Sequence, residues 1–221
     1  MQLTPRVISV IKNFSMINNS MLFRANEPYL STLSSTKTVM AKAKIDQEFE
    51  REFCIYDLQK FLNVLALFKE PDIFFDEKQL RIEGDRQRIF YTYADRKSIT
   101  VAPKRTIEMP TIDVQFTLTP EALSSLLKAA SVLGLSEIAV CGDGKKMTLE
   151  AFDNNNSTSN LYAQNIGETK AKFQVVYKVD YFRLIPNVYD VSVCASTGSH
   201  FKGDDIEYWI AFERNSTKFG A

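Results

Sequence analysis

Hydrophobic residues recur with helical spacing in four segments of the chain. The segments cover residues 4–18, 57–69 and 119–133, and a shorter one covers residues 179–185. Apolar side chains three or four positions apart are typical of an amphipathic helix that buries one face. The pattern therefore predicts four helices, two in each half of the chain.

The first and third of these helices begin with the same three residues. The stretch "LTPRVISVIKNF" starts at Leu3, and "LTPEALSSLLKA" starts at Leu118. A threonine before the helix can cap its free amides, and a proline at the first helical position lacks the amide that would stay unpaired. The repeated start predicts equivalent helices in two copies of one structural unit.

Between the helices, short apolar runs bounded by polar turns predict strands. The runs are "FCIY", "DIFFD", "QLRIEG" and "RIFYTY" in the first half, and "QFTLT", "EIAVCG", "MTLEAF", "NLYAQNI", "KFQVVYK", "YDVSVCAS" and "IEYWIAFER" in the second. Strand-rich blocks joined by tight turns indicate an α+β fold with antiparallel sheets. We predict two similar domains, residues 1–94 and 112–221, each with two helices packed on antiparallel sheets. Residues 95–111, polar and basic with two prolines, would connect them.

Charge is unevenly distributed, although its sum is zero. The chain has 27 Lys and Arg against 27 Asp and Glu, which argues against a uniformly basic nucleic-acid binder. The predicted helices nevertheless contain acids only in their first turns, where the helix dipole favours them. Their basic residues are Arg6, Lys12, Lys60, Lys69, Lys128 and Arg183. Solvated helix faces usually mix both signs, so this set predicts one basic surface for the phosphates of a polyanion.

The motifs of enzymes and metal sites are missing from the sequence. His200 is the sole histidine, and "GDGKK" lacks the spacing of a phosphate-binding loop. Cysteines and carboxylates do not cluster at ligand spacing. We therefore expect no enzymatic activity, no metal and no cofactor. Apolar runs fall short of a membrane span, and charges interrupt the N-terminal apolar residues, so a cytosolic location without a signal peptide is expected.

Four motifs carry a resemblance to a known family. In order along the chain, "VIKNFSMIN", "IYDLQKFLNVLALF", "VAPKRTIEMP" and "YWIAFE" resemble the DNA polymerase sliding clamp of T4-type bacteriophages. The resemblance covers nearly the whole chain. It implies a DNA-clamp fold, of which three subunits close head to tail into a homotrimeric ring with helices facing double-stranded DNA.

The resemblance also implies partners. The ring would tether the replicative DNA polymerase, an ATP-driven clamp loader would place it on DNA, and it would aid late transcription in the cytoplasm of the infected bacterial host. A DNA-binding or phage structural protein that does not encircle DNA is the alternative.

Two further sites follow from the resemblance. A pocket for the C-terminal tail of the polymerase would involve Val101, Ile107 and Trp209, and the alternative is that Trp209 packs under the connector. Subunit contacts would join one edge strand with Ile89 and Tyr91 to another with Leu161 and Ala163, unless these strands lie inside a sheet.

Overall fold

The computed structural model describes residues 1–156 and 158–220. The chain divides into two compact units, Met1–Thr106 and Ile107–Ala221. The boundary between them lies within the segment predicted as the connector, residues 95–111.

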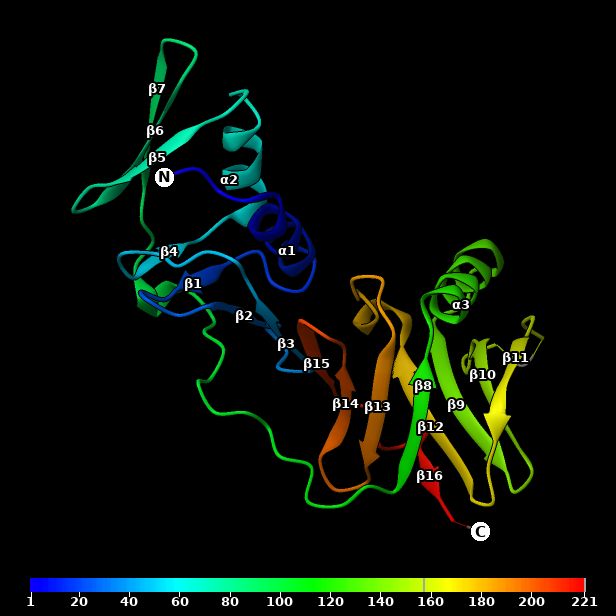
Figure 1. Cartoon of the computed structure of the whole chain (residues 1–221). Helices are drawn as coiled ribbons and strands as arrows, with labels where there is room; N and C mark the ends of the chain where they lie inside the picture. Colours follow the sequence, from blue (N-terminus) through cyan, green and yellow to red (C-terminus); the bar gives the residue numbers. More distant parts are fainter. Residues whose placement is uncertain (157, 221) are drawn as a thin grey trace. The chain divides into compact units, whose positions relative to one another are not determined.

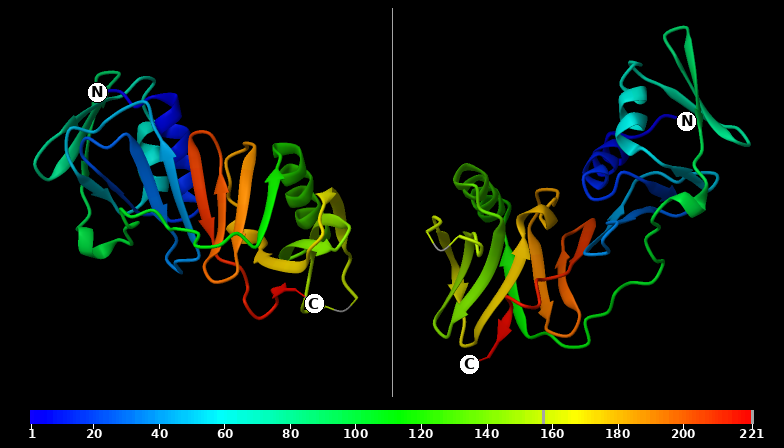
Figure 2. Two further views of the ribbon diagram at one scale, coloured as in Figure 1. Left: turned by 60° about the horizontal axis from the view of Figure 1, so that its bottom comes forward. Right: turned by 180° about the vertical axis from the view of Figure 1, so that it is seen from behind.

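The first unit combines two α-helices with short antiparallel strands (Figure 1). Strand β1 pairs with β4, β2 pairs with β3, and β5, β6 and β7 form a three-stranded sheet in that order. Helices α1 and α2 lie side by side, as both further views also show (Figure 2). The elements are α1 (Pro5–Ser15), β1 (Met21–Phe23), β2 (Tyr29–Leu33), β3 (Val39–Lys44), β4 (Phe53–Ile55), α2 (Leu58–Leu65), β5 (Asp72–Phe75), β6 (Gln79–Gly84), β7 (Gln87–Thr92) and the 3-10 turn η1 (Arg96–Ser98).

The second unit has one α-helix and two antiparallel groups of strands. One group has the order β11-β10-β9-β12-β16, and the other runs β15-β14-β13-β8. Helix α3 packs against β10 and β11. The elements are β8 (Val114–Leu118), α3 (Pro120–Leu133), β9 (Glu137–Asp143), β10 (Lys146–Phe152), β11 (Tyr162–Glu168), β12 (Lys172–Lys178), the 3-10 turn η2 (Val179–Tyr181), β13 (Tyr189–Cys194), β14 (Gly198–Lys202), β15 (Ile206–Ile210) and β16 (Lys218–Phe219).

The repeated Leu-Thr-Pro stretch starts equivalent helices in the two units. The Thr4 hydroxyl accepts a hydrogen bond from the Val7 amide, and the Thr119 hydroxyl accepts one from the Ala122 amide, both at 3.2 Å. Each proline occupies the first helical position, as predicted. Helix α3 then ends at Gly134, whose left-handed backbone (φ 67°) suits a residue without a Cβ.

The prediction of a fourth helix over residues 179–185 is wrong. Only the three-residue turn η2 forms there, and Phe182 already leaves the helical region with ψ at 47°. Lys178 precedes the turn without a side-chain capping bond, and Pro186 disfavours helical backbone at Ile185. Seven residues with these ends cannot sustain a helix, so the described part of the second unit has one α-helix where we predicted two.

The capping bond of α3 can be tested by removing the Thr119 hydroxyl. Thr119→Ala leaves the Ala122 amide without its partner, and we expect the free energy of unfolding to fall by about 1 kcal/mol. Urea unfolding followed by circular dichroism measures this change. Ser124→Ala, at an exposed position inside the same helix, is the control and should change stability by less than about 0.5 kcal/mol. Equal losses in both variants would contradict the capping role.

Candidate nucleic-acid and partner interfaces

The α-helices of the described chain expose positive charge and almost no negative charge. Arg6 and Lys12 lie on α1, Lys60 on α2 and Lys128 on α3, and the one acid within these helices is Glu121, in the first turn of α3. Lys12, Lys60 and Lys128 are exposed, whereas Arg6 is half-buried. The Arg6 Nε donates to the Lys44 carbonyl at 3.4 Å. The opposite faces of the helices are buried, so the cations lie on the side that remains accessible.

The acid that precedes α2 has a structural role. The Asp57 Oδ1 accepts from the Lys60 amide at 2.8 Å and from the Asn19 side chain at 3.1 Å. The Lys60 amide, with help from Asn19, lowers the pKa of the Asp57 carboxyl, which favours its charged form. This carboxylate is therefore explained by helix capping.

Two of the six predicted cations lie outside the helices. Lys69 follows the end of α2 at Leu65 by four residues and is exposed. Arg183 follows η2, where its Nη2 donates to Asp180 Oδ1 at 2.8 Å. The placement of Arg183 on a helix is wrong, because the predicted helix does not form. DNA contact by any of the six residues stays a prediction.

Trp209 is buried within the second unit. Its side chain is 4% exposed, and its ring stacks on that of His200 with centroids 4.7 Å apart. The indole Nε1 donates to the Ile107 carbonyl at 3.1 Å, and Glu207 Oε2 lies 2.9 Å from His200 Nε2. Strand alternation places Trp209 on a polar face, but residue 107 bonds to the indole there. The structure thus favours packing of Trp209 beneath Ile107, one of the two roles that the sequence leaves open.

The predicted tail pocket is only partly assembled within one unit. Ile107 and Trp209 lie together, whereas Val101 belongs to the unit Met1–Thr106 and is half-buried there. Whether these residues bind a polymerase tail stays a prediction.

Both strands predicted to form subunit contacts lie at sheet edges. Strand β7 is the last of the order β5-β6-β7, and β11 is the first of β11-β10-β9-β12-β16. Each therefore has one edge with no partner strand in the part of the chain that the structure describes. An open edge presents amide and carbonyl groups to which another strand can add.

A pocket of about 530 Å³ adjoins β7 and α2, and Ile89, Tyr91, Tyr56 and Val64 line it. Tyr91 packs edge-on against Phe61 with ring centroids 5.5 Å apart, and its hydroxyl donates to the Asp57 carbonyl at 3.1 Å. This apolar hollow lies beside the open edge of β7.

Exposed residues border the other edge. Leu161, one residue before β11, is 61% exposed, and Ala163 within β11 is exposed as well. Together, β7 with its pocket and β11 with Leu161 offer two different surfaces for strand pairing.

Other kinds of site leave few traces. Residues 1–156 and 158–220 contain no helix that is both long and apolar enough to cross a membrane. Within the same residues, histidine, cysteine and carboxylate side chains do not gather in threes around a point that could hold a metal ion.

Two α+β units with acid-poor helices and open strand edges define a clamp-type subunit. Residues 4–101 match the protein family described as DNA polymerase processivity factor, and residues 115–214 match the family described as gp45 sliding clamp, C terminal. The sliding clamp of Vibrio phage KVP40 is 33% identical over 96% of this chain and 99% of its own length. The sliding clamp of Escherichia phage RB69 is 24% identical over 98% and 99%. The chain belongs to the sliding clamp family of DNA polymerase processivity factors.

Solved structures support the fold at lower identity. PCNA from Thermococcus kodakaraensis has a TM-score of 0.66 at 16% identity, covering 94% of this chain and 96% of its own. The beta clamp of H. pylori has a TM-score of 0.70 at 15% identity, covering 96% of this chain and 65% of its own. The predicted DNA-clamp fold is confirmed, apart from the missing fourth helix.

The indole hydrogen bond of Trp209 is open to test. Trp209→Phe keeps an aromatic ring beside His200 but removes the N–H that binds the Ile107 carbonyl. We expect a loss of about 1 kcal/mol in the free energy of unfolding and faster amide exchange around Ile107. Hydrogen exchange read by mass spectrometry measures the second effect. His200→Ala, which removes the stacked ring but leaves the hydrogen bond, is the control. Unchanged exchange around Ile107 in Trp209→Phe would contradict the role assigned to the indole.

Proposed function

We propose that three copies of this chain form a closed ring that encircles duplex DNA and tethers a replicative DNA polymerase. The membership of the sliding clamp family and the exposed cations of the α-helices carry this proposal. Lysines in water attract phosphates without reading sequence, and each contact is weak and screened by salt. Weak phosphate contacts let a ring move along DNA, whereas strong base contacts would hold it at one place.

In this proposal the ring closes by strand pairing between subunits. The open edge of β11 in one copy would add to the open edge of β7 in the next, with Leu161 entering the pocket that Ile89 and Tyr91 line. Because the two edges differ, the contact is head to tail, which generates a closed ring when the rotation fits.

Other partners belong to the same proposal. The C-terminal tail of the polymerase would bind near Ile107 and Trp209, and one archaeal relative in fold, A. fulgidus PCNA, was solved with the C-terminal region of FEN-1 bound. A separate clamp loader would open the ring with ATP, and late-transcription proteins would bind it in the host cytoplasm. The chain itself would have no catalytic role and need no cofactor.

A topological experiment separates this ring from a protein that binds only the surface of DNA. Chains loaded with their clamp loader on nicked circular DNA should stay bound and then leave when the circle is cut. The molar mass in solution should be three times 25.2 kDa. Light scattering and gel filtration of the DNA complexes provide both measurements. Equal release from circular and linear DNA would favour the surface binder.

A variant at the proposed contact provides the control for that experiment. Leu161→Asp places a charge where an apolar pocket should receive the side chain, so each subunit contact should weaken by about 2 kcal/mol. The mass and the retention on circles should both fall. Val188→Asp alters a similarly exposed residue, 52% against 61%, and should leave both unchanged. A full-sized, retained ring in Leu161→Asp would exclude this contact.

The helix cations are tested by the salt dependence of DNA binding. In Lys12→Ala with Lys128→Ala, the slope of log affinity against log salt should become shallower by about 0.9 for every phosphate that the variant no longer neutralises. Fluorescence anisotropy with duplex DNA measures the slope, and the ring should keep its mass. Lys145→Ala with Lys146→Ala, two exposed lysines at the β9–β10 turn, is the matched control. A slope that changes only in the control would place the DNA contact elsewhere.

A further inference from the structure

A basic pocket lies on the β2–β3 hairpin of the first unit. Its volume is about 320 Å³, and residues 103–104 approach the hairpin there. Ser31 of β2 faces Lys42 of β3 in the antiparallel register, and both line the pocket. Their neighbours Leu30 and Thr32 point to the opposite face and are only 2% exposed. The pocket therefore opens on the face of the hairpin that is not part of the core.

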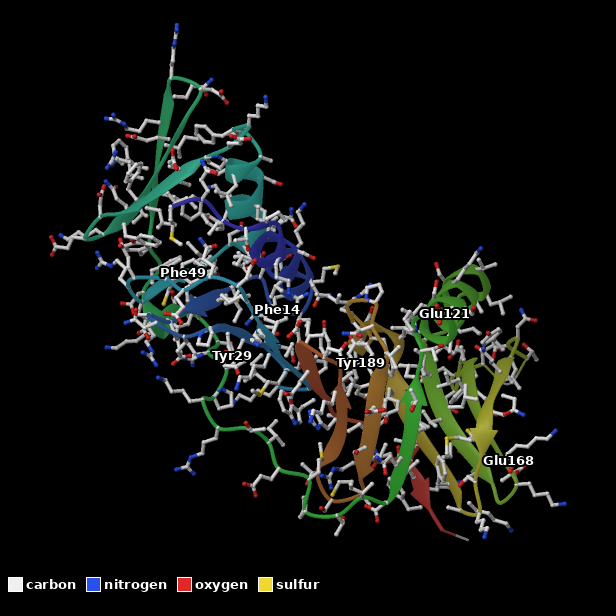
Figure 3. All side chains as sticks on the ribbon, viewed as in Figure 1. Phe14, Tyr29, Phe49, Glu121, Glu168 and Tyr189 are labelled. Atoms are coloured by element: carbon white, nitrogen blue, oxygen red, sulfur yellow. The ribbon has the colours of Figure 1, made fainter. Side chains whose placement is uncertain are left out.

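Figure 3 helps to separate the two faces of this hairpin. Phe14 of α1 is fully buried on the helix side, whereas Tyr29, at the start of β2, is 41% exposed and lies on the far side from α1. Tyr29 also lines the pocket. The pocket is thus separated from the cations of α1 by the hairpin itself.

Arg24 is the buried cation of the pocket. Its side chain is 7% exposed, its Nη1 donates to the Ser31 hydroxyl at 3.0 Å, and its Nη2 donates to the Ala102 carbonyl at 2.7 Å. The Nε is buried and has no hydrogen-bond partner in the described part of the chain. The nearest carboxylate oxygen, Glu27 Oε2, lies 4.0 Å away, beyond hydrogen-bonding distance. A buried guanidinium N–H without a partner costs free energy, which an added anion nearby would reduce.

The pocket holds more positive than negative charge. Arg24, Lys42 and Lys104 line it together with one carboxylate, that of Glu27. Glu27 Oε1 accepts from Lys104 Nζ at 2.9 Å. Lys42 Nζ lies 4.4 Å from the centre of the Tyr29 ring, and residues 1–156 and 158–220 place no carboxylate within 4.0 Å of it. Three cations facing one anion leave room for a second anion.

We propose that this pocket binds a carboxylate of an acidic peptide segment in a partner protein. The carboxylate would lie between Lys42 and Lys104, in the field of Arg24. Pro28, Tyr29 and Pro103 form apolar walls, which suit the aliphatic or aromatic side chain next to an acidic residue. A peptide is favoured over DNA because the pocket lies on the other face of the hairpin from the basic surface of α1.

The site differs from the predicted tail pocket of the polymerase. It is built wholly within Met1–Thr106, whereas Ile107 and Trp209 belong to the second unit. It also does not depend on the ring, because every residue in it comes from one copy of the chain.

The pocket can be tested by titrating the isotope-labelled protein with acetyl-Asp-Leu-Asp-amide and following the amide signals by NMR. Signals around Arg24, Ser31 and Lys42 should shift, and the neutral peptide acetyl-Asn-Leu-Asn-amide should leave them in place. Lys42→Ala should weaken binding by about fivefold, and Lys42→Arg, which keeps the charge, should restore it to within about twofold.

Lys44→Ala is the matched control. Lys44 is the next lysine on the same face of β3 and is exposed, but it does not line the pocket. Its replacement should change the affinity by less than about twofold. Equal weakening in Lys42→Ala and Lys44→Ala, or equal binding of the acidic and neutral peptides, would overturn the proposal in favour of general charge attraction.

Two further probes distinguish the source of the anion. Inorganic phosphate should shift the same signals far more weakly than the acidic peptide, because it cannot use the apolar walls. A short duplex DNA should shift signals of α1 and leave those around Lys42 unchanged. If duplex DNA moves the Lys42 signals and loses as much affinity in Lys42→Ala as the peptide does, the pocket is a DNA contact and the proposal fails. None of these measurements requires a ring, so their outcome is independent of the topological experiment.

Discussion

The burial of one face of each helix is the constraint on which the other features depend. Val7, Val10, Ile11 and Phe14 of α1 have no exposed surface, and Leu58 and Phe61 of α2 are buried nearly as fully. Burying a side chain of this size contributes about 1.5–3 kcal/mol, so the rotation of each helix about its axis is strongly fixed. Once that face is fixed, Lys12 and Lys60 have to lie on the accessible side. Their exposure follows from the apolar pattern rather than from any contact of their own.

A chain of zero net charge can still present a positive surface if its acids lie elsewhere. Four acids alternate through residues 46–52, between β3 and β4, and all four are exposed. The carboxylates of Asp57 and Glu121 are confined to helix starts, where free amides and the dipole favour them. The sum of charges therefore says little about whether the protein binds a polyanion, and the distribution over elements says much more.

Features that depend on local pattern can be predicted from the sequence, and features that depend on tertiary contact cannot. The Thr-Pro helix starts and the strands at 72–75, 79–84 and 137–143 are predictable because spacing and capping act over a few residues. The helix expected over 179–185 does not form, because its apolar spacing has no cap and extends over too short a length. Alternation within β15 assigns Trp209 to an open face, since it cannot reveal that residue 107, about a hundred positions away, bonds to it.

The strands at 29–33 and 39–44 and the role of Arg24 are not evident from the sequence. Nothing near Arg24 in the sequence marks it, because its partner Ala102 is 78 residues away along the chain. A lone arginine becomes part of a site only when a distant segment folds against it. The signal that could have found the site is the surplus of basic residues in 95–111, which implies an acid or a partner elsewhere.

The two basic regions of the first unit differ in the way their charges are held. Lys12 and Lys60 are exposed, and a long solvated lysine in water exchanges one phosphate for another at little cost. Arg24 is held by two hydrogen bonds and is almost wholly buried, so its guanidinium is fixed in position before any ligand arrives. A fixed fork favours one geometry and slows release, whereas mobile ammonium groups tolerate many. The exposed lysines therefore suit a partner along which the protein must move, and the buried arginine suits a partner that stays.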